Sequence, residues 1–283
     1  MIAFSKRNLL VFFKDRTSVF FSLLAVFIIV GLYALFLGDV WTGSLEFEGA
    51  RFLMDSWIAS GLMAVVSVTT TMGAFGTMVE DKTRKIEKDF IASPLKRSSI
   101  VGGYILSAFL IGMIISIITL AILEVYILIN GGKLMSLLVL VKVLGILVLS
   151  TFTNTAIMLF IVLFFKSNNA FSTASTIIGT IIGFLTGIYL PIGNLPEAVQ
   201  WVVKLFPPSH SAALFRQVMM QEPMTSSFAG APEEAVTGFK ELMGVIYNIG
   251  DKEVSTVASI LIVAITGVVF LFLSVLKLST KKK

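Results

Sequence analysis

Six long apolar stretches constrain this 283-residue chain more than any other feature of its sequence. A helix needs about 20 mostly apolar residues to cross a hydrocarbon core about 30 Å thick, and each stretch is long enough. The composition agrees, since 56% of the residues are hydrophobic and only 14% are charged. We therefore predict an all-α polytopic membrane protein whose single transmembrane domain covers residues 1–283. The six predicted spans are 18–38, 57–79, 100–129, 134–165, 170–190 and 254–276.

The Lys and Arg residues of the connections predict the orientation, because cationic loops resist translocation. Fifteen cations fall in the segment before the first span, the loops 80–99 and 166–169 and the C-terminal tail, and six fall in the other connections. Both termini are therefore predicted to be cytoplasmic, with the chain in the plasma or inner membrane. Because the net charge of +5 gathers beside apolar spans, we expect a lipid bilayer and no nucleic acid as its surroundings.

Two segments outside the spans are predicted to be short helices at the membrane surface. Residues 1–17 interleave apolar residues with four cations, as in an interfacial helix on anionic headgroups. The alternative is a plain basic flank, and in either case we expect a retained anchor because no cleavage site follows. Residues 191–253 lie on the external side, where prolines divide short amphipathic helices that either re-enter the membrane or rest on its outer leaflet.

The segment EDKTRKIEKDFIASPLKRSS, residues 80–99, is dense in both signs of charge between two spans. Acids precede bases by four positions, which supports a solvated helix, and apolar residues share one side of it. Connections between helices commonly need only about 2 to 8 residues, so the surplus predicts a docking surface for a cytoplasmic partner. The alternative is a solvated connector whose cations only determine topology. The residues that form this pattern are Glu80, Asp81, Arg84, Ile86, Phe90, Ile91 and Pro94.

Small and hydroxyl residues mark two of the spans as candidate contact faces. Span five carries Ser175, Gly179, Gly183 and Gly187 at every fourth position, which favours close helix packing at a pathway or subunit interface. Span two has a polar half that includes Ser67, Thr70 and Thr71. These hydroxyls either face a pathway or bond to their own helix backbone.

Glu124 and Lys142 are the charges well inside predicted spans. Their positions on either side of the turn at Gly131-Gly132 place them at similar depth, so we expect a structural ion pair rather than a proton or ion relay.

Catalytic and ligand-binding motifs are absent from the sequence. The chain has no cysteine, its single histidine has no partner for a metal, and no P-loop pattern occurs. We therefore predict a protein that is not an enzyme, with no catalytic, cofactor or metal site of its own.

Together these features resemble the permease subunit of type 2 ABC exporters, a family with bacterial multidrug, bacteriocin and polysaccharide exporters. The resemblance covers nearly the whole chain. It is most specific at residues 80–97, which end in Ser93-Pro94-Leu95-Lys96-Arg97, and at L-P-x-x-x-Q-W-x-x-x-L-F-P-P, residues 195–208. One departure is Thr83-Arg84-Lys85, which stands where many members carry a Gly-Thr pair.

The resemblance implies how such a protein works. Residues 80–99 would be the coupling helix that docks on a separate cytoplasmic ABC ATPase, which binds ATP and Mg. A second permease chain, identical or related, would complete the dimer, with spans two and five facing the pathway or its axis. The substrate expected from the apolar interior is an amphipathic small molecule, peptide or lipid. The alternatives are an ATP-independent transporter or channel and a permease-like subunit for immunity or sensing.

Overall fold

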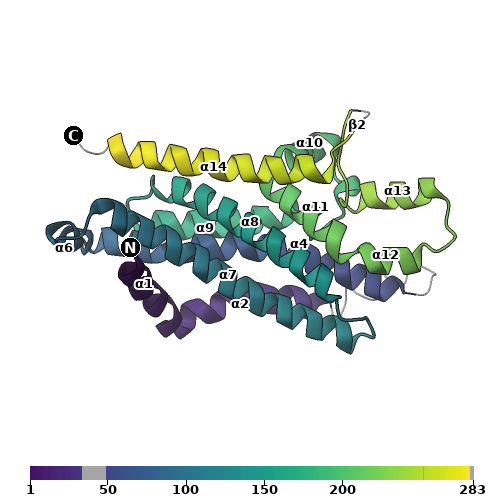
Figure 1. The fold of residues 1–283 in the computed structure, drawn as a ribbon, viewed down its shortest axis with the longest axis horizontal. Coiled ribbons are helices and arrows are strands. Elements are labelled where there is room, and N and C mark those ends of the chain that lie inside the picture. Colours follow the sequence, from purple (N-terminus) through teal and green to yellow (C-terminus); the bar gives the residue numbers. More distant parts are fainter. Residues whose placement is uncertain (34–48, 251, 281–283) are drawn as a thin grey trace.

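The computed structural model describes residues 1–33, 49–250 and 252–280 of the protein. Long helices run side by side, with α6 and the N-terminus at one end and the short helices α12 and α13 at the other (Figure 1). The elements are α1 (Ile2–Lys14), α2 (Arg16–Leu32), α4 (Ala50–Ala74), α5 (Gly76–Thr83), α6 (Glu87–Ala92), α7 (Arg97–Ile129), α8 (Leu137–Val162), α9 (Asn168–Leu185), the 3-10 helix η2 (Ile192–Asn194), α10 (Glu197–Leu205), α11 (Pro207–Met219), α12 (Gln221–Ser227), α13 (Glu233–Leu242), β1 (Asn248–Ile249), β2 (Lys252–Glu253) and α14 (Thr256–Thr280).

Four helices of the described residues are long and apolar enough to cross a membrane. They confirm an all-α polytopic protein. The other two predicted spans correspond to α2 and α9, which are helices of 17 and 18 residues, so these two crossings stay predictions. The end of the first predicted span, residues 34–38, lies outside the described residues. The four are Ala50–Thr83, which takes α4 and α5 together, and Arg97–Ile129, Leu137–Val162 and Thr256–Ser279, which correspond to α7, α8 and α14.

The centre of the bundle is α4, which packs on α7, α8 and α11 and is the most deeply buried of the long helices. It begins at Ala50, earlier than the predicted start at residue 57. The predicted start came too late because Arg51 and Asp55 are charged. In the structure these two side chains form an ion pair at 3.3 Å, and both contact the hydroxyl of Tyr126 on α7. Because these partners satisfy both charges, the helix continues through them.

Prolines divide the segment before α14 into short helices, as the sequence predicts. Helix α10 ends at Leu205, and Pro207 and Pro208 form the first turn of α11, where the missing N–H groups cost no helical hydrogen bond. Helix α11 lies against α4, α8 and α14, so its residues are mostly buried. A hairpin of β1 and β2 leads into α14.

Arg216 on α11 is fully buried and holds the far end of the bundle together. Its guanidinium donates to the carbonyls of Thr186 at 2.7 Å and Gly187 at 3.2 Å, just after α9. It also donates to the carbonyl of Gly244 at 3.4 Å and lies 5.2 Å from the ring centroid of Trp57. Burial lowers the pKa of Arg216 to about 10, so the side chain stays charged at neutral pH. One cation thus joins α11, α4, the end of α9 and the turn after α13.

Candidate functional site

The charged segment 80–99 folds into two short helices rather than one. Helix α5 ends at Thr83, and Lys85 takes a left-handed conformation with φ 64° before α6 begins at Glu87. The expected i, i+4 pair of Glu80 and Arg84 forms, at 2.7 Å. The prediction of a single helix over this segment is therefore wrong, because the left-handed residue turns the chain between α5 and α6.

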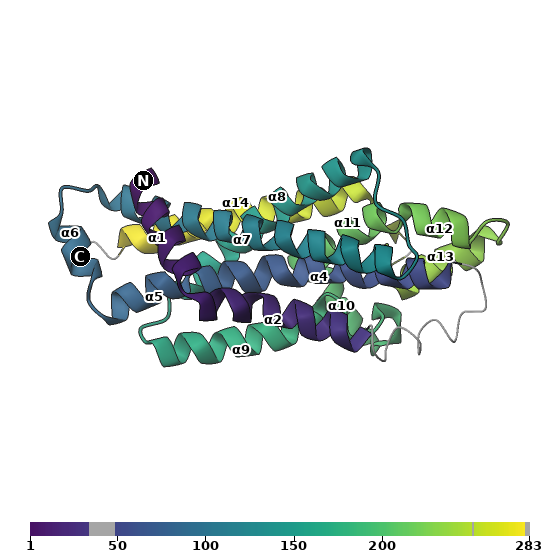
Figure 2. The same cartoon turned by 90° about the horizontal axis from the view of Figure 1, so that it is seen from below.

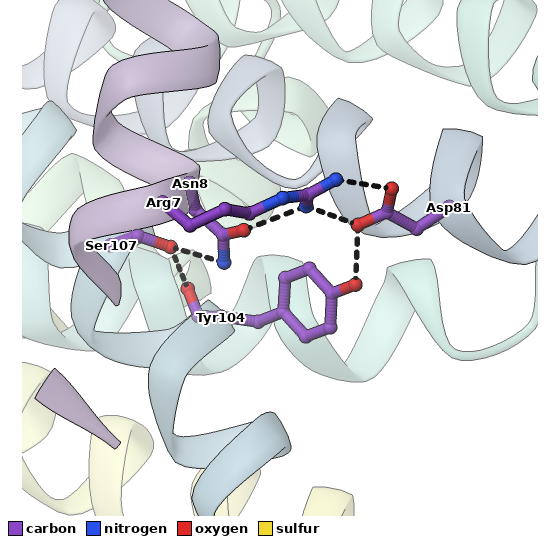
Figure 3. A network of polar contacts seen from close by, with 5 residues as sticks. All are labelled: Arg7, Asn8, Asp81, Tyr104 and Ser107. Carbon is purple, nitrogen blue, oxygen red and sulfur yellow. Dashed lines mark hydrogen bonds and ion pairs between the residues drawn. The ribbon is translucent and has the colours of Figure 1, made fainter. Parts of the chain in front are cut away.

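Asp81 corrects the prediction of a solvated helix face, because its side chain is only 4% exposed and contacts α1 and α7 instead of Lys85. Figure 3 shows Arg7 of α1 donating to both Asp81 carboxylate oxygens, at 2.5 and 2.9 Å. The hydroxyl of Tyr104 on α7 donates to the same carboxylate at 2.6 Å. The hydrogen bond and charge of Asp81 raise the pKa of Arg7. This bidentate geometry fixes the orientation of both side chains.

Asn8 extends this contact between α1 and α7. Its side-chain oxygen accepts a hydrogen bond from Arg7 at 2.9 Å, and its amide donates to Ser107 of α7 at 3.3 Å (Figure 3). Asn8 and Ser107 are both buried, so the polar contact stabilises α1 against α7 away from water. We call Arg7, Asn8, Asp81, Tyr104 and Ser107 the α1–α5–α7 network.

Helix α6 contacts the same network through Phe90. The Phe90 ring meets the Phe4 ring edge-to-face at 5.0 Å, and the guanidinium carbon of Arg7 lies 5.3 Å from the Phe90 centroid. Phe4 in turn packs edge-to-face on Tyr104 at 5.0 Å. The three residues before Phe90 in α6, Glu87, Lys88 and Asp89, carry exposed charges. Helix α6 therefore contacts the rest of the molecule through Phe90 and exposes these three charges.

Helix α5 also contacts the loop between α8 and α9 and the first residue of α9. The Lys82 ammonium donates to the carbonyl of Phe165 at 2.6 Å, and the hydroxyl of Thr83 lies 3.4 Å from the side-chain oxygen of Asn168. The segment 80–99 is thus connected to α1, α7 and the α8–α9 loop.

The remaining predicted residues of the segment are less informative. Ile86 is half-buried between the two helices and Pro94 is exposed after α6, while the side chain of Ile91 lies outside the described residues. Sequence reasoning missed Arg7, Asn8, Tyr104 and Ser107. Their contacts between helices join residues 23 to 99 positions apart in the sequence, so no local pattern marks them.

The three predicted hydroxyl residues of α4 lie in the packed interior of this chain. Ser67, Thr70 and Thr71 are almost completely buried. The hydroxyl of Ser67 lies 3.0 Å from that of Ser150 and accepts from Asn154 of α8 at 2.8 Å. Ser67, Thr70 and Thr71 each also donate to a backbone carbonyl three or four positions back in α4, at 2.6 to 2.9 Å, which is the second of the two predicted alternatives. A pathway face on α4 stays a prediction.

The small-residue stripe of α9 divides into two parts. Gly187 lies beyond the end of the helix with φ 67°, and a Cβ at Gly183 would lie 2.2 Å from Tyr189 of the same chain. Both glycines therefore serve the local turn, and the stripe is shorter than predicted. Ser175 and Gly179 are half-buried, and a Cβ at Gly179 would meet no atom within 4 Å.

The expected ion pair between Glu124 and Lys142 does not appear among the ion pairs of the described residues. Glu124 accepts from the backbone N–H of Met135 at 3.1 Å, and Lys142 is exposed on α8. Similar depth in the membrane alone therefore does not bring the two side chains together. The part of the chain that the structure describes also holds no group of three or more His, Cys, Asp or Glu residues suited to a metal.

Comparison with known families decides the class of the protein. The model of the ABC-2 family transporter proteins matches residues 46–276. The chain belongs to the ABC-2 transporter family. This ABC-2 protein is therefore the membrane permease of an ABC transporter, a multi-pass transmembrane subunit and not its ATPase. A comparison with curated proteins found no match. The matched region includes Asp81 and Tyr104, whereas Arg7 and Asn8 precede it.

Proposed function

We propose that this ABC-2 protein is the permease of an ATP-driven exporter, moving an amphipathic small molecule, peptide or lipid-like molecule out of a bacterial cell. A separate ATPase binds ATP and Mg, docks on α6 and transmits its motion through the α1–α5–α7 network. A second permease chain, identical or related, completes the pathway.

The observation that carries the proposal is the position of α6, which exposes its charges and is connected to several long helices. Its charged side is exposed at the end of the molecule where the N-terminus and the end of α14 also lie (Figures 1 and 2). Its inner side contacts α1 through Phe90, and α5 contacts α7 and the α8–α9 loop. A force on α6 would therefore reach several long helices rather than one flexible loop.

The distribution of cations supports the inner side of the cell membrane for this end. Cationic segments stay in the cytoplasm, and the segments counted as cationic include residues 1–17, 80–99 and the tail. We place both termini and α6 in the cytoplasm, and α10 to α13 on the outer side.

Two cysteine variants test the docking and the topology, because the natural chain has no cysteine. Glu87→Cys on α6 should react with an impermeant maleimide only after the cells are permeabilised, and should crosslink to the ATPase. Glu233→Cys on α13, also exposed, should react in intact cells and should not crosslink. Labelling of both sites from the same side would contradict this topology.

Charge reversal tests the coupling. Glu87→Lys with Asp89→Lys should weaken ATPase binding by about tenfold or more, which corresponds to about 1.4 kcal/mol, and should lower export per ATP hydrolysed. Glu233→Lys with Glu234→Lys on α13 is the matched control and should export normally. Unchanged transport by the α6 variant, or transport by the purified permease without any ATPase, would support the ATP-independent alternative.

A further inference from the structure

A cleft of about 770 Å³ lies on the α6 half of the molecule, between α1, α2, α4, α5 and α9. Its wall contains hydroxyl residues, two phenylalanines and two glycines, Gly73 and Gly76. Gly73 is exposed, and a Cβ built on it would meet no atom within 4 Å. No side chain of α4 therefore fills the cleft at Gly73, and the space is large enough for a small amphipathic molecule.

The charges of the cleft have one sign. Asp15 and Glu80 line it, and neither Lys, Arg nor His does among its described lining residues. This contrasts with the surrounding end of the molecule, which is rich in cations. Glu80 pairs with Arg84, and the two side chains are 42% and 67% exposed. Such an exposed ion pair is weak, so a bound cation can compete for the Glu80 carboxylate. The Asp15 carboxylate accepts from the backbone N–H of Thr17 and adds a second negative charge to the cleft.

The hydroxyl groups of the wall add acceptors to the carboxylates. Thr69, Ser175 and Thr176 each donate their proton to a backbone carbonyl of their own helix. Their oxygen lone pairs are then available to a donor in the cleft. Phe12 and Phe171 add aromatic groups to the lining, and Phe171, the less buried of the two, supplies apolar surface for the body of a ligand.

We propose that this cleft is a binding site for cationic amphipaths, molecules that carry an ammonium, guanidinium or phosphonium group on an apolar body. The inference rests on the proposed function where it makes such cations the substrate class of the transporter. The binding itself needs no ATPase. The cleft is lined by two carboxylates and by no Lys, Arg or His among its described lining residues, so it would disfavour anionic amphipaths of the same size.

Tetraphenylphosphonium and tetraphenylborate form a suitable pair of probes, because they share shape and differ in the sign of charge. Saturable binding to the full-length protein in nanodiscs would be measured, with empty nanodiscs subtracted. We expect saturable binding of tetraphenylphosphonium. Asp15→Asn with Glu80→Gln should weaken it by about fivefold or more, because two charge contacts are lost, and should not weaken binding of tetraphenylborate.

A steric variant gives an independent measurement. Gly73→Leu should block tetraphenylphosphonium, since a Cβ at this position meets no atom within 4 Å and the longer side chain would extend into the space of the cleft. Gly145→Leu on α8 is the matched control, because a Cβ there also meets no atom within 4 Å and Gly145 does not line the cleft. Monodisperse elution of each variant verifies its folding.

Absence of saturable tetraphenylphosphonium binding, or equal affinity in the wild type and the Asp15→Asn, Glu80→Gln variant, would overturn the proposal. Saturable cation binding, together with failure of Glu87→Cys to crosslink to any ATPase, would uphold this site and reject the proposed exporter. A protein that couples to an ATPase but binds no cation would reject this site and leave the proposed exporter in place.

Discussion

Arg7 donates two hydrogen bonds to the carboxylate of Asp81, at 2.5 and 2.9 Å, across 74 positions of the sequence. Asp81 is buried while Arg7 is about one-third exposed. Loss of the carboxylate therefore leaves the cation able to reach water, and loss of the cation leaves a buried acid. The buried carboxylate of Asp81, which accepts from Arg7 and Tyr104, therefore holds α5 on α1 and α7.

Asp81→Asn should lower the free energy of unfolding by about 1 to 3 kcal/mol, below the cost of breaking a fully buried pair because Arg7 is partly solvated. Thermal unfolding of the purified protein in detergent measures the change. Glu80→Gln, one residue earlier in an exposed pair, is the matched control and should cost less than about 1 kcal/mol. Equal stability of the two variants would contradict the structural role of Asp81.

Arg216→Lys should destabilise the protein almost as much as Arg216→Met, by about 3 kcal/mol or more, because buried hydrogen bonds of a charged group are lost. A lysine has the same charge but lacks the planar fork that reaches the carbonyls of Thr186, Gly187 and Gly244. Thermal unfolding again measures the loss. Full stability of the lysine variant would show that charge alone is sufficient at this position.

Gly112→Ala should destabilise the bundle by about 1 to 3 kcal/mol through overpacking. A Cβ at Gly112 of α7 would lie 2.8 Å from the Thr151 methyl and 2.9 Å from the Thr71 methyl, so three helices meet there. Gly145→Ala on α8 is the control, since its Cβ would meet no atom within 4 Å, and it should leave stability unchanged or slightly raised. Similar unfolding temperatures for the two variants would contradict this close approach.

His210 should make stability depend on pH in a predictable direction. Burial lowers the pKa of His210 below its ordinary value of 6.5. The ring lies 2.9 Å from the carbonyl of Lys204 through Nε2, which must carry the proton because a carbonyl only accepts, and 3.2 Å from the Ser259 hydroxyl through Nδ1. The folded state thus favours the neutral imidazole.

As the pH falls below about 6.5, the unfolded chain takes up a proton that the folded chain resists, so the free energy of unfolding decreases. His210→Gln should lose this dependence while keeping the slopes due to other groups. The difference between the two unfolding temperatures, measured from pH 8 to pH 5, should therefore shrink on the acid side. Because His210 is the single histidine, parallel curves would contradict the prediction.

The sequence alone determined the properties that depend on local composition. Hydropathy predicted the membrane class and the positions of the four long helices, because burial in lipid requires uninterrupted apolar residues. Prolines at 207 and 208 predicted the boundary between α10 and α11, because proline cannot continue a helix. The charged segment 80–99 and its ion pair from Glu80 to Arg84 were also evident from spacing.

Only the tertiary structure decided which side of each helix faces its neighbours. Helices α4, α7 and α8 are apolar around most of their surface, so periodicity does not mark an inner face. For this reason Ser67 and Thr71 proved to be contacts between helices, and Glu124 did not meet Lys142. Asp81 became buried because Arg7 and Tyr104, distant in the sequence, arrive beside it when the helices pack.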